Sequence, residues 1–206
     1  MIGIICLNLQ KKDFMENRLC VFCSSSNDLE PKYYKLAEDL VLEIKKANYS
    51  IMHGAGSIGL MGSLLNAAKE NNVNIIGVVP EKLNKPHIVD SKNQKLVVTK
   101  DMKDRKEYLR ENSSAFIALP GGFGTLEEIL EVITLKQLKY HNKAIVFINA
   151  YGYFDNLFKQ FDYMFETNFA NHNYRNLYFV ANSPSEAIDY INNYTHQNIY
   201  DKYLRE

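Results

Sequence analysis

The chain has 206 residues, of which 23% are charged, and its 24 basic and 24 acidic side chains leave no net charge. A balanced charge provides no general attraction to nucleic acid or to an anionic membrane, so any anion-binding site has to be local. Three cysteines do not make a disulfide framework, which favours a reducing compartment and predicts a cytoplasmic protein.

Residues 1–17 are expected to form a loosely ordered extension before a single domain over residues 18–206. The apolar run Ile2–Leu9 is followed by two lysines, whereas a secretory signal carries its positive charge before the apolar segment. Met15 is a second candidate for the native start. No stretch approaches the ~20 apolar residues of a membrane span, so no membrane association is expected.

Apolar runs and amphipathic segments alternate from Arg18 onwards. The runs that predict strands are Leu19–Cys23, Tyr49–His53, Ile75–Val79, Lys95–Thr99, Ala115–Leu119, Ala144–Ile148 and Tyr178–Val180. The segments that predict helices are Pro31–Lys46, a stretch ending at Glu70, Met102–Glu111, Ile129–Tyr140 and Ser185–Tyr194. This alternation predicts an α/β fold, a doubly wound Rossmann-like parallel sheet with helices on both faces.

Three polar or glycine-rich loops follow strands of this predicted sheet, at Ser24, Gly54 and Gly121. Ligands of such folds bind at the carboxyl ends of the strands, so these loops are expected to contribute to a binding site. The polar loop Glu81–Gln94 is long enough to form a lid over it.

The turn Pro120–Gly124 lies between a predicted strand and a predicted helix. Its glycines let the backbone take positive φ and let a ligand approach closely, and the first amides of the following helix lack partners within it. The sequence therefore predicts an anion site, with Glu127 and Glu128 in the first helical turn beside it. A capping box that starts at Thr125 is an alternative role for Glu128.

Three other patterns are ambiguous or unhelpful when each is taken alone. Gly54–Gly59 fits G-x-G-x-x-G, which indicates either phosphate binding or only close packing of a helix on a strand. The basic cluster from Lys100 to Lys106 is typical of a solvated helix face. Cys20 and Cys23 form C-x-x-C, but residues three apart on a strand point to opposite faces, so no metal site is expected.

The motifs together resemble one specific family. Pro120–Glu128 matches P-G-G-x-G-T-x-x-E, the hallmark of the LOG ("lonely guy") family of cytokinin riboside 5′-monophosphate phosphoribohydrolases. The similarity extends from Arg18 to about Tyr194 and includes Gly59–Gly62, Gly77–Pro80 and Arg105-Lys106. The chain departs from the family pattern at Ser24, His53, Ala55 and Lys103.

The resemblance implies hydrolysis of the N-glycosidic bond of a purine nucleoside 5′-monophosphate, without a metal or other cofactor. Catalytic roles would fall on Arg105 and Glu128. Substrate-binding roles would fall on Ser25, Gly56, Gly59, Met61, Gly62, Met102, Lys106, Gly121, Gly122, Gly124 and Thr125. Both AMP and an isopentenylated nucleotide stay open as substrates.

The family also implies a homodimer. The aromatic segment Tyr151–Phe169 is expected to pack against the sheet or against a second subunit. Two other functions stay open on the same scaffold. One is a non-catalytic nucleotide-binding or molybdopterin-type cofactor carrier, and the other is a dinucleotide-dependent oxidoreductase.

Overall fold

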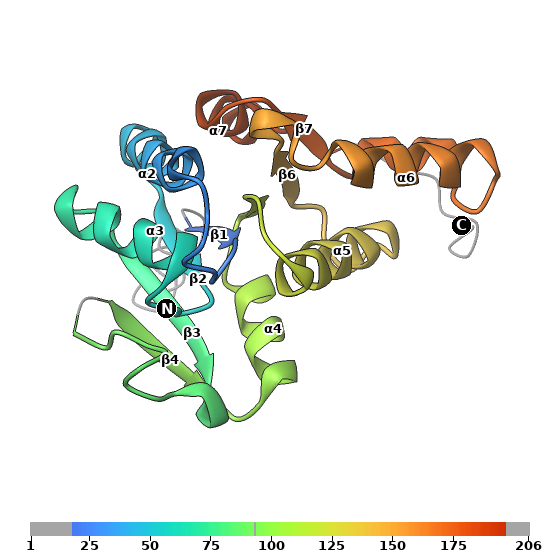
Figure 1. The fold of residues 1–206 in the computed structure, drawn as a ribbon. Helices are drawn as coiled ribbons and strands as arrows, with labels where there is room; N and C mark the ends of the chain where they lie inside the picture. The colour runs from blue at the N-terminus through green and yellow to red at the C-terminus, as the bar shows by residue number, and fades with distance from the viewer. Residues whose placement is uncertain (1–17, 93, 197–206) are drawn as a thin grey trace, which may run out of the picture. The chain divides into compact units, whose positions relative to one another are not determined.

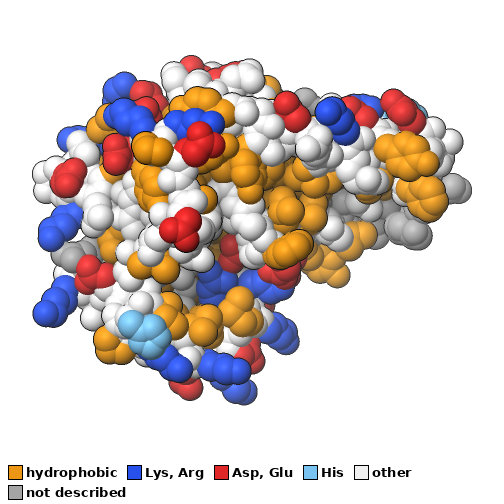
Figure 2. Space-filling model, in the orientation of Figure 1, with side chains coloured by type: hydrophobic (Ala, Val, Ile, Leu, Met, Phe, Trp, Pro, Cys, Tyr) orange, Lys and Arg blue, Asp and Glu red, His pale blue; other side chains and the backbone are white. Residues whose placement is uncertain are grey.

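The computed structural model of the chain describes residues 18–92 and 94–196 (Figure 1). The predicted N-terminal extension therefore lies outside the described residues. Among the residues that are described, no helix combines the length and the apolarity that crossing a membrane requires. Acidic and basic side chains are interspersed on the face shown in Figure 2, in keeping with the balanced composition.

Seven strands form a parallel sheet in the order β4-β3-β2-β1-β5-β6-β7. The strands are β1 (Arg18–Phe22), β2 (Ser50–His53), β3 (Ile75–Pro80), β4 (Lys95–Thr99), β5 (Ala115–Ala118), β6 (Ala144–Ile148) and β7 (Phe179–Ala181). The helices are α2 (Pro31–Lys46), α3 (Gly59–Glu70), α4 (Met102–Glu111), α5 (Phe123–Gln137), α6 (Asp155–Glu166) and α7 (Pro184–Asn192). The prediction of a doubly wound Rossmann-like α/β fold is confirmed.

The chain divides into two compact units, which we describe separately. The first comprises the strand residues before Phe22 together with Ser25–Ala115. The second comprises Phe22–Ser24 together with the chain from Phe116 onwards. The boundaries between the two units therefore fall at the end of β1 and at the start of β5.

In the first unit, β2 lies between β1 and β3, with Ile51 in register with Leu19 and Ile75. Both crossovers, through α2 and α3, advance in the same direction along the sheet, so right-handed connections place these two helices on the same face. They lie side by side (Figure 1), and their apolar faces supply fully buried residues such as Leu40 and Leu64. The helix α4 packs against β3 and β4.

In the second unit, the core is built around the fully buried Phe147 of β6. Its ring contacts Phe154, Phe158, Phe161 and Tyr178 edge-on, with ring centroids 5.2 to 6.5 Å apart. Edge-to-face packing is the favoured geometry for aromatic pairs. The prediction that the aromatic segment packs against the sheet is therefore confirmed for these phenylalanines.

Gly59, at the start of α3, provides a test of the close packing in the first unit. Its φ is +59°, and a Cβ there would lie 2.6 Å from backbone atoms of Ser25 and Ser26. We expect Gly59→Ala to lower the free energy of unfolding by about 1–3 kcal/mol, because both the conformation and the space exclude a side chain. Thermal unfolding measures this loss.

Gly122→Ala is the control, because a Cβ at that position meets no atom within 4 Å. An equal fall in the melting temperature of both variants would contradict the packing described for Gly59.

Candidate active site

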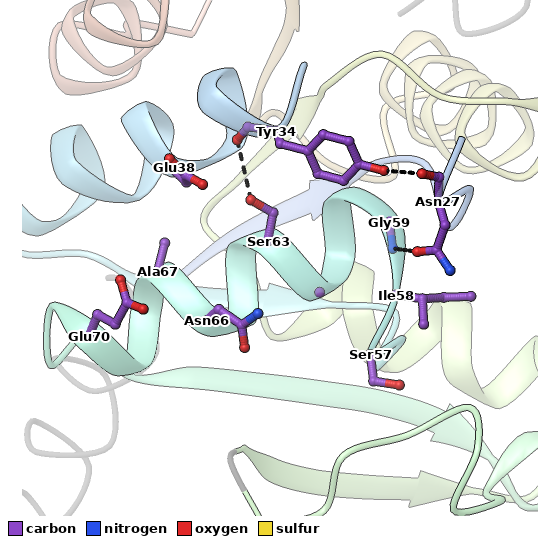
Figure 3. A pocket seen from close by; sticks show the side chains of 11 residues that line it. Asn27, Tyr34, Glu38, Ser57, Ile58, Gly59, Ser63, Asn66, Ala67 and Glu70 are labelled. Atoms are coloured by element: carbon purple, nitrogen blue, oxygen red, sulfur yellow. Dashed lines mark hydrogen bonds between the residues drawn. The ribbon is translucent and has the colours of Figure 1, made fainter. Parts of the chain in front are cut away.

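In the first unit, the glycine loop between β2 and α3 is fastened to the loop that follows β1. The N–H of Gly59 donates to the side-chain oxygen of Asn27 at 2.9 Å, and the hydroxyl of Tyr34 donates to the carbonyl of Asn27 at 2.6 Å (Figure 3). This places Ser25, a predicted binding residue, against Gly59. The sequence did not indicate that Asn27 holds the glycine loop, because its partner Gly59 is 32 residues away.

A pocket of about 480 Å³ opens between α2 and α3 beside this contact (Figure 3). It includes the predicted binding residues Gly59 and Gly62. Its wall also carries the carboxylates of Glu38 and Glu70, which would repel a phosphate. The pocket is therefore a poor candidate for the phosphate site of a nucleotide, although it adjoins the glycine loop.

Arg105 projects from α4 and is almost entirely buried, with 8% of its surface exposed. Its Nε donates to the carbonyl oxygen of Val78 on β3 at 3.0 Å. Its guanidinium lies over Gly54, where a Cβ would collide with Nη2 and would lie 3.3 Å from the sulfur of Met61. The solvated-face interpretation of the basic cluster is thus wrong for Arg105, and the structure brings Arg105 and Met61 together at Gly54.

His53, the last residue of β2, lies beside Arg105 and is fully buried. Its Nε2 is 2.7 Å from the side-chain oxygen of Gln94, and the Gln94 amide donates to the carbonyl of Ala55 at 3.2 Å. Burial is the main cause that lowers the pKa of His53, the hydrogen bond to the Gln94 oxygen opposes it, and the charge of Arg105 adds to it, so that the pKa is about 4. The imidazole is therefore neutral at physiological pH.

The loop Glu81–Gln94, which the sequence analysis treats as a lid, is attached to the glycine loop. The backbone N–H and the hydroxyl of Ser57 both donate to the carbonyl of Ile88 at 3.0 Å. An antiparallel bridge joins Gly56 to Val89, and Val89 packs against Ala55. Any movement of this loop would thus pull on the glycine loop.

In the second unit, α5 begins at Phe123, with Gly122 as its N-cap and no side chain capping it. The N–H groups of Phe123, Gly124 and Thr125 therefore have no acceptor within the helix, which makes this turn a favourable anion site. The helix starts six residues before its predicted first residue, Ile129, because the glycines are accommodated at the N-cap and in the first turn.

This early start corrects two expectations about the carboxylates. Thr125 lies inside α5 and is buried, and its hydroxyl packs so closely on Gly121 that a Cβ there would collide with it. Thr125 is not an N-cap, so the capping-box role for Glu128 is wrong. Glu127 and Glu128 lie in the second turn rather than the first, with Glu128 half-buried and Glu127 exposed.

Glu128 lies close to Cys23, the residue that follows β1. Burial raises the pKa of the Cys23 thiol, and the negative charge of Glu128 raises it further. The backbone N–H of Ser24 donates to the carbonyl of Pro120 at 3.3 Å, and the hydroxyl of Tyr153 donates to the carbonyl of Gly121 at 2.8 Å. Tyr153, which the sequence analysis placed only in aromatic packing, therefore also holds the hallmark loop.

The predicted site residues divide between the two units. The first unit contains Ser25, Gly56, Gly59, Met61, Gly62, Met102, Arg105 and Lys106, and the second contains Gly121, Gly122, Gly124, Thr125 and Glu128. Met102 and Ser25 are exposed, and Lys106 is half-buried. Within residues 18–92 and 94–196, no three His, Cys, Asp or Glu side chains are grouped to hold a metal ion.

A family model described as possible lysine decarboxylase matches residues 61–191. The cytokinin riboside 5′-monophosphate phosphoribohydrolase LOG4 of Arabidopsis thaliana is 36% identical over 196 residues, which cover 94% of this chain and 90% of that protein. The probable cytokinin riboside 5′-monophosphate phosphoribohydrolase LOGL3 of Oryza sativa subsp. japonica is 38% identical over 177 residues, 86% of this chain and 84% of that one. This chain belongs to the LOG family.

Solved structures confirm the fold of this LOG-family chain. The molybdenum cofactor binding protein of Rippkaea orientalis matches with a TM-score of 0.65 at 21% identity, over 86% of this chain and 96% of that one. The Moco carrier protein of Chlamydomonas reinhardtii matches with a TM-score of 0.64 at 21% identity, over the same shares of the two chains. At these identities the likeness concerns the fold alone.

The low pKa of His53 predicts how stability depends on pH. Between about pH 4 and pH 6.5 the unfolded chain binds a proton on this histidine that the folded chain does not, so the free energy of unfolding rises with pH. The pKa shift of His53 raises the free energy of unfolding by roughly 3 kcal/mol across this pH window. Above about pH 6.5 it causes no further change with pH.

Urea unfolding of the wild type and of His53→Gln at pH 4.5 and pH 7 measures the effect. The wild type is expected to lose more stability on acidification than the variant. Parallel losses would show that His53 has an ordinary pKa in the folded protein.

Proposed function

We propose that this LOG-family chain hydrolyses the N-glycosidic bond of a purine nucleoside 5′-monophosphate. Water adds at the anomeric carbon of the ribose, and the base departs with a proton, so that the products are the free base and ribose 5-phosphate. The proposal rests on the complete hallmark Pro120–Glu128 together with the buried Arg105, in a chain whose phosphoribohydrolase relatives match it over most of their length.

Glu128 is proposed to act on the ribose. Breaking a glycosidic bond develops positive charge on the sugar, and a carboxylate stabilises that charge, holds the ribose hydroxyls or activates water. Burial, and next the negative charge of Glu128, raise the pKa of Cys23, so that thiol is uncharged and the carboxylate of Glu128 is proposed as the acting group. The amides at the start of α5 are proposed to bind the 5′-phosphate.

Arg105 is proposed to bind the phosphate or the departing base. Its guanidinium is permanently protonated and presents a planar set of donors. The hydrogen bond from Nε to Val78 fixes one end of this plane. Gly54 and Met61 shape the space in which the other end lies, and we propose that Met102, Lys106, Ser25 and the glycine loop complete the contacts to the nucleotide.

The relatives are named for cytokinin riboside 5′-monophosphates, so an isopentenylated nucleotide is one proposed substrate and AMP is the other. We further propose a homodimer in the cytoplasm, without a cofactor. The second candidate function is a carrier that binds a nucleotide or a molybdopterin-type cofactor without turnover. The retained Arg105 and Glu128 favour hydrolysis over it.

Substitution of Glu128 tests the catalytic assignment. The protein is incubated with AMP and with isopentenyl-AMP, and the free base is measured by chromatography. We expect the wild type to release base from at least one of them, and Glu128→Gln to reduce the rate at least ~100-fold, because glutamine keeps the shape but not the charge.

Glu127→Gln is the matched control, since Glu127 is the exposed neighbour on the same helix. Its rate is expected to stay near that of the wild type. Absence of base release from both substrates at high enzyme concentration would refute the proposal, and equal rates for the two variants would refute the role of Glu128.

Gly54→Ala tests the role of Arg105. The added methyl collides with Nη2, so kcat/KM should fall about ten- to a hundredfold because the guanidinium is misplaced, and thermal unfolding of the same variant measures separately any loss of stability. Arg105→Lys is expected to cause a similar loss. Full activity of Gly54→Ala would show that the position of this guanidinium does not matter for turnover.

A further inference from the structure

His53 and Gln94 form a buried polar pair that the proposed chemistry does not use. His53 is fully buried, and Gln94 is 9% exposed. His53 ends β2, whereas Gln94 is the last residue of the loop before β4. Burying such groups is costly unless they are hydrogen-bonded, so their presence in the core calls for an explanation.

The hydrogen bonds of Gln94 determine which nitrogen of His53 carries the proton. The Gln94 amide nitrogen donates to the carbonyl of Ala55, so its oxygen faces His53. That oxygen accepts a hydrogen bond, and therefore Nε2 of His53 is protonated. Nδ1 is then a bare acceptor, and it has no hydrogen-bond partner among the described residues, which reduces stability.

The residues that contact the His53–Gln94 pair lie next to residues that contact Arg105. Gly77 on β3 leaves the space for the Gln94 side chain, because a Cβ there would collide with it. The next residue, Val78, accepts the hydrogen bond from Nε of Arg105. On β2, His53 directly precedes Gly54, over which the guanidinium lies.

The pair also closes one end of the loop Glu81–Gln94. Another attachment of this loop is the pair of hydrogen bonds from Ser57 to Ile88. Between these two attachments, the segment from His53 to Ser57 is held against the loop. His53 is also held by its sheet pairing, so loss of the Gln94 contact would remove one restraint on the residues that follow it, and therefore on Gly54 beneath Arg105.

We propose that His53 and Gln94 form a latch that positions the guanidinium of Arg105. His53 is a positioning residue, and a neutral imidazole suits this place because a second positive charge would repel Arg105. The consequence for turnover rests on the proposed function, whereas the consequence for the position of Arg105 does not.

Three substitutions of His53 separate the latch from simple packing. Gln places an amide nitrogen near the position of Nε2 and can still donate to Gln94, whereas Asn reaches only the position of Nδ1, and Leu donates nothing. We expect His53→Gln to keep kcat/KM within about threefold, and His53→Asn and His53→Leu to lower it about ten- to a hundredfold. Equal activity of all three variants would overturn the latch.

A double mutant shows whether His53 acts through Arg105. If it does, the double variant His53→Leu/Arg105→Lys should have a kcat/KM within about threefold of that of Arg105→Lys alone, because the positioned group is already altered. Additive losses would overturn the proposal, since they would mean that His53 acts independently.

The Nε–H signal of Arg105 gives a readout that needs no substrate. The Nε–H group is buried and bonded to Val78, so its proton should exchange slowly with solvent in NMR spectra. The signal is assigned by its absence from the spectrum of Arg105→Lys. We expect slow exchange in the wild type and His53→Gln, and at least about tenfold faster exchange in His53→Asn and His53→Leu. Unchanged exchange in all variants would overturn the latch even if the wild type releases no base.

Discussion

The first unit depends on a permanent charge that is held almost entirely out of water. The guanidinium of Arg105 is tolerated there because Val78 accepts its Nε–H, Gly54 leaves room for it, and the neighbouring His53 is kept neutral. Two of these conditions lie at the end of β2, and the third lies on β3. The glycine loop, the end of β3 and the loop before β4 are therefore built around one side chain.

In the second unit, the start of α5 leaves backbone donors that have no acceptor within the helix. Starting α5 at Phe123, without a side-chain cap, leaves its first amides for a ligand. The loop before them is fixed from several sides, by Thr125 packed on Gly121 and by Tyr153 bonded to its carbonyl. A turn held by these two contacts, next to amides without an acceptor in the helix, suits binding of a phosphate.

The sequence predicted the parts whose causes are local. The strand and helix pattern and the hallmark loop follow from residues that are neighbours in the chain. The start of α5 was predicted too late because glycines usually weaken a helix, yet at an N-cap and in a first turn they cost little. Asn27 and Gln94 escaped notice because their partners are 32 and 41 residues away, a separation at which no local pattern exists.

Phosphorus-31 NMR of the protein with AMP tests most directly which bond is broken. Hydrolysis of the glycosidic bond leaves the phosphate on the sugar. We predict that the resonance of at least one of the two nucleotides, AMP or isopentenyl-AMP, is replaced by that of ribose 5-phosphate, with no inorganic phosphate formed. Release of inorganic phosphate would contradict this prediction. So would nucleotide resonances that do not decline for either AMP or its isopentenylated form.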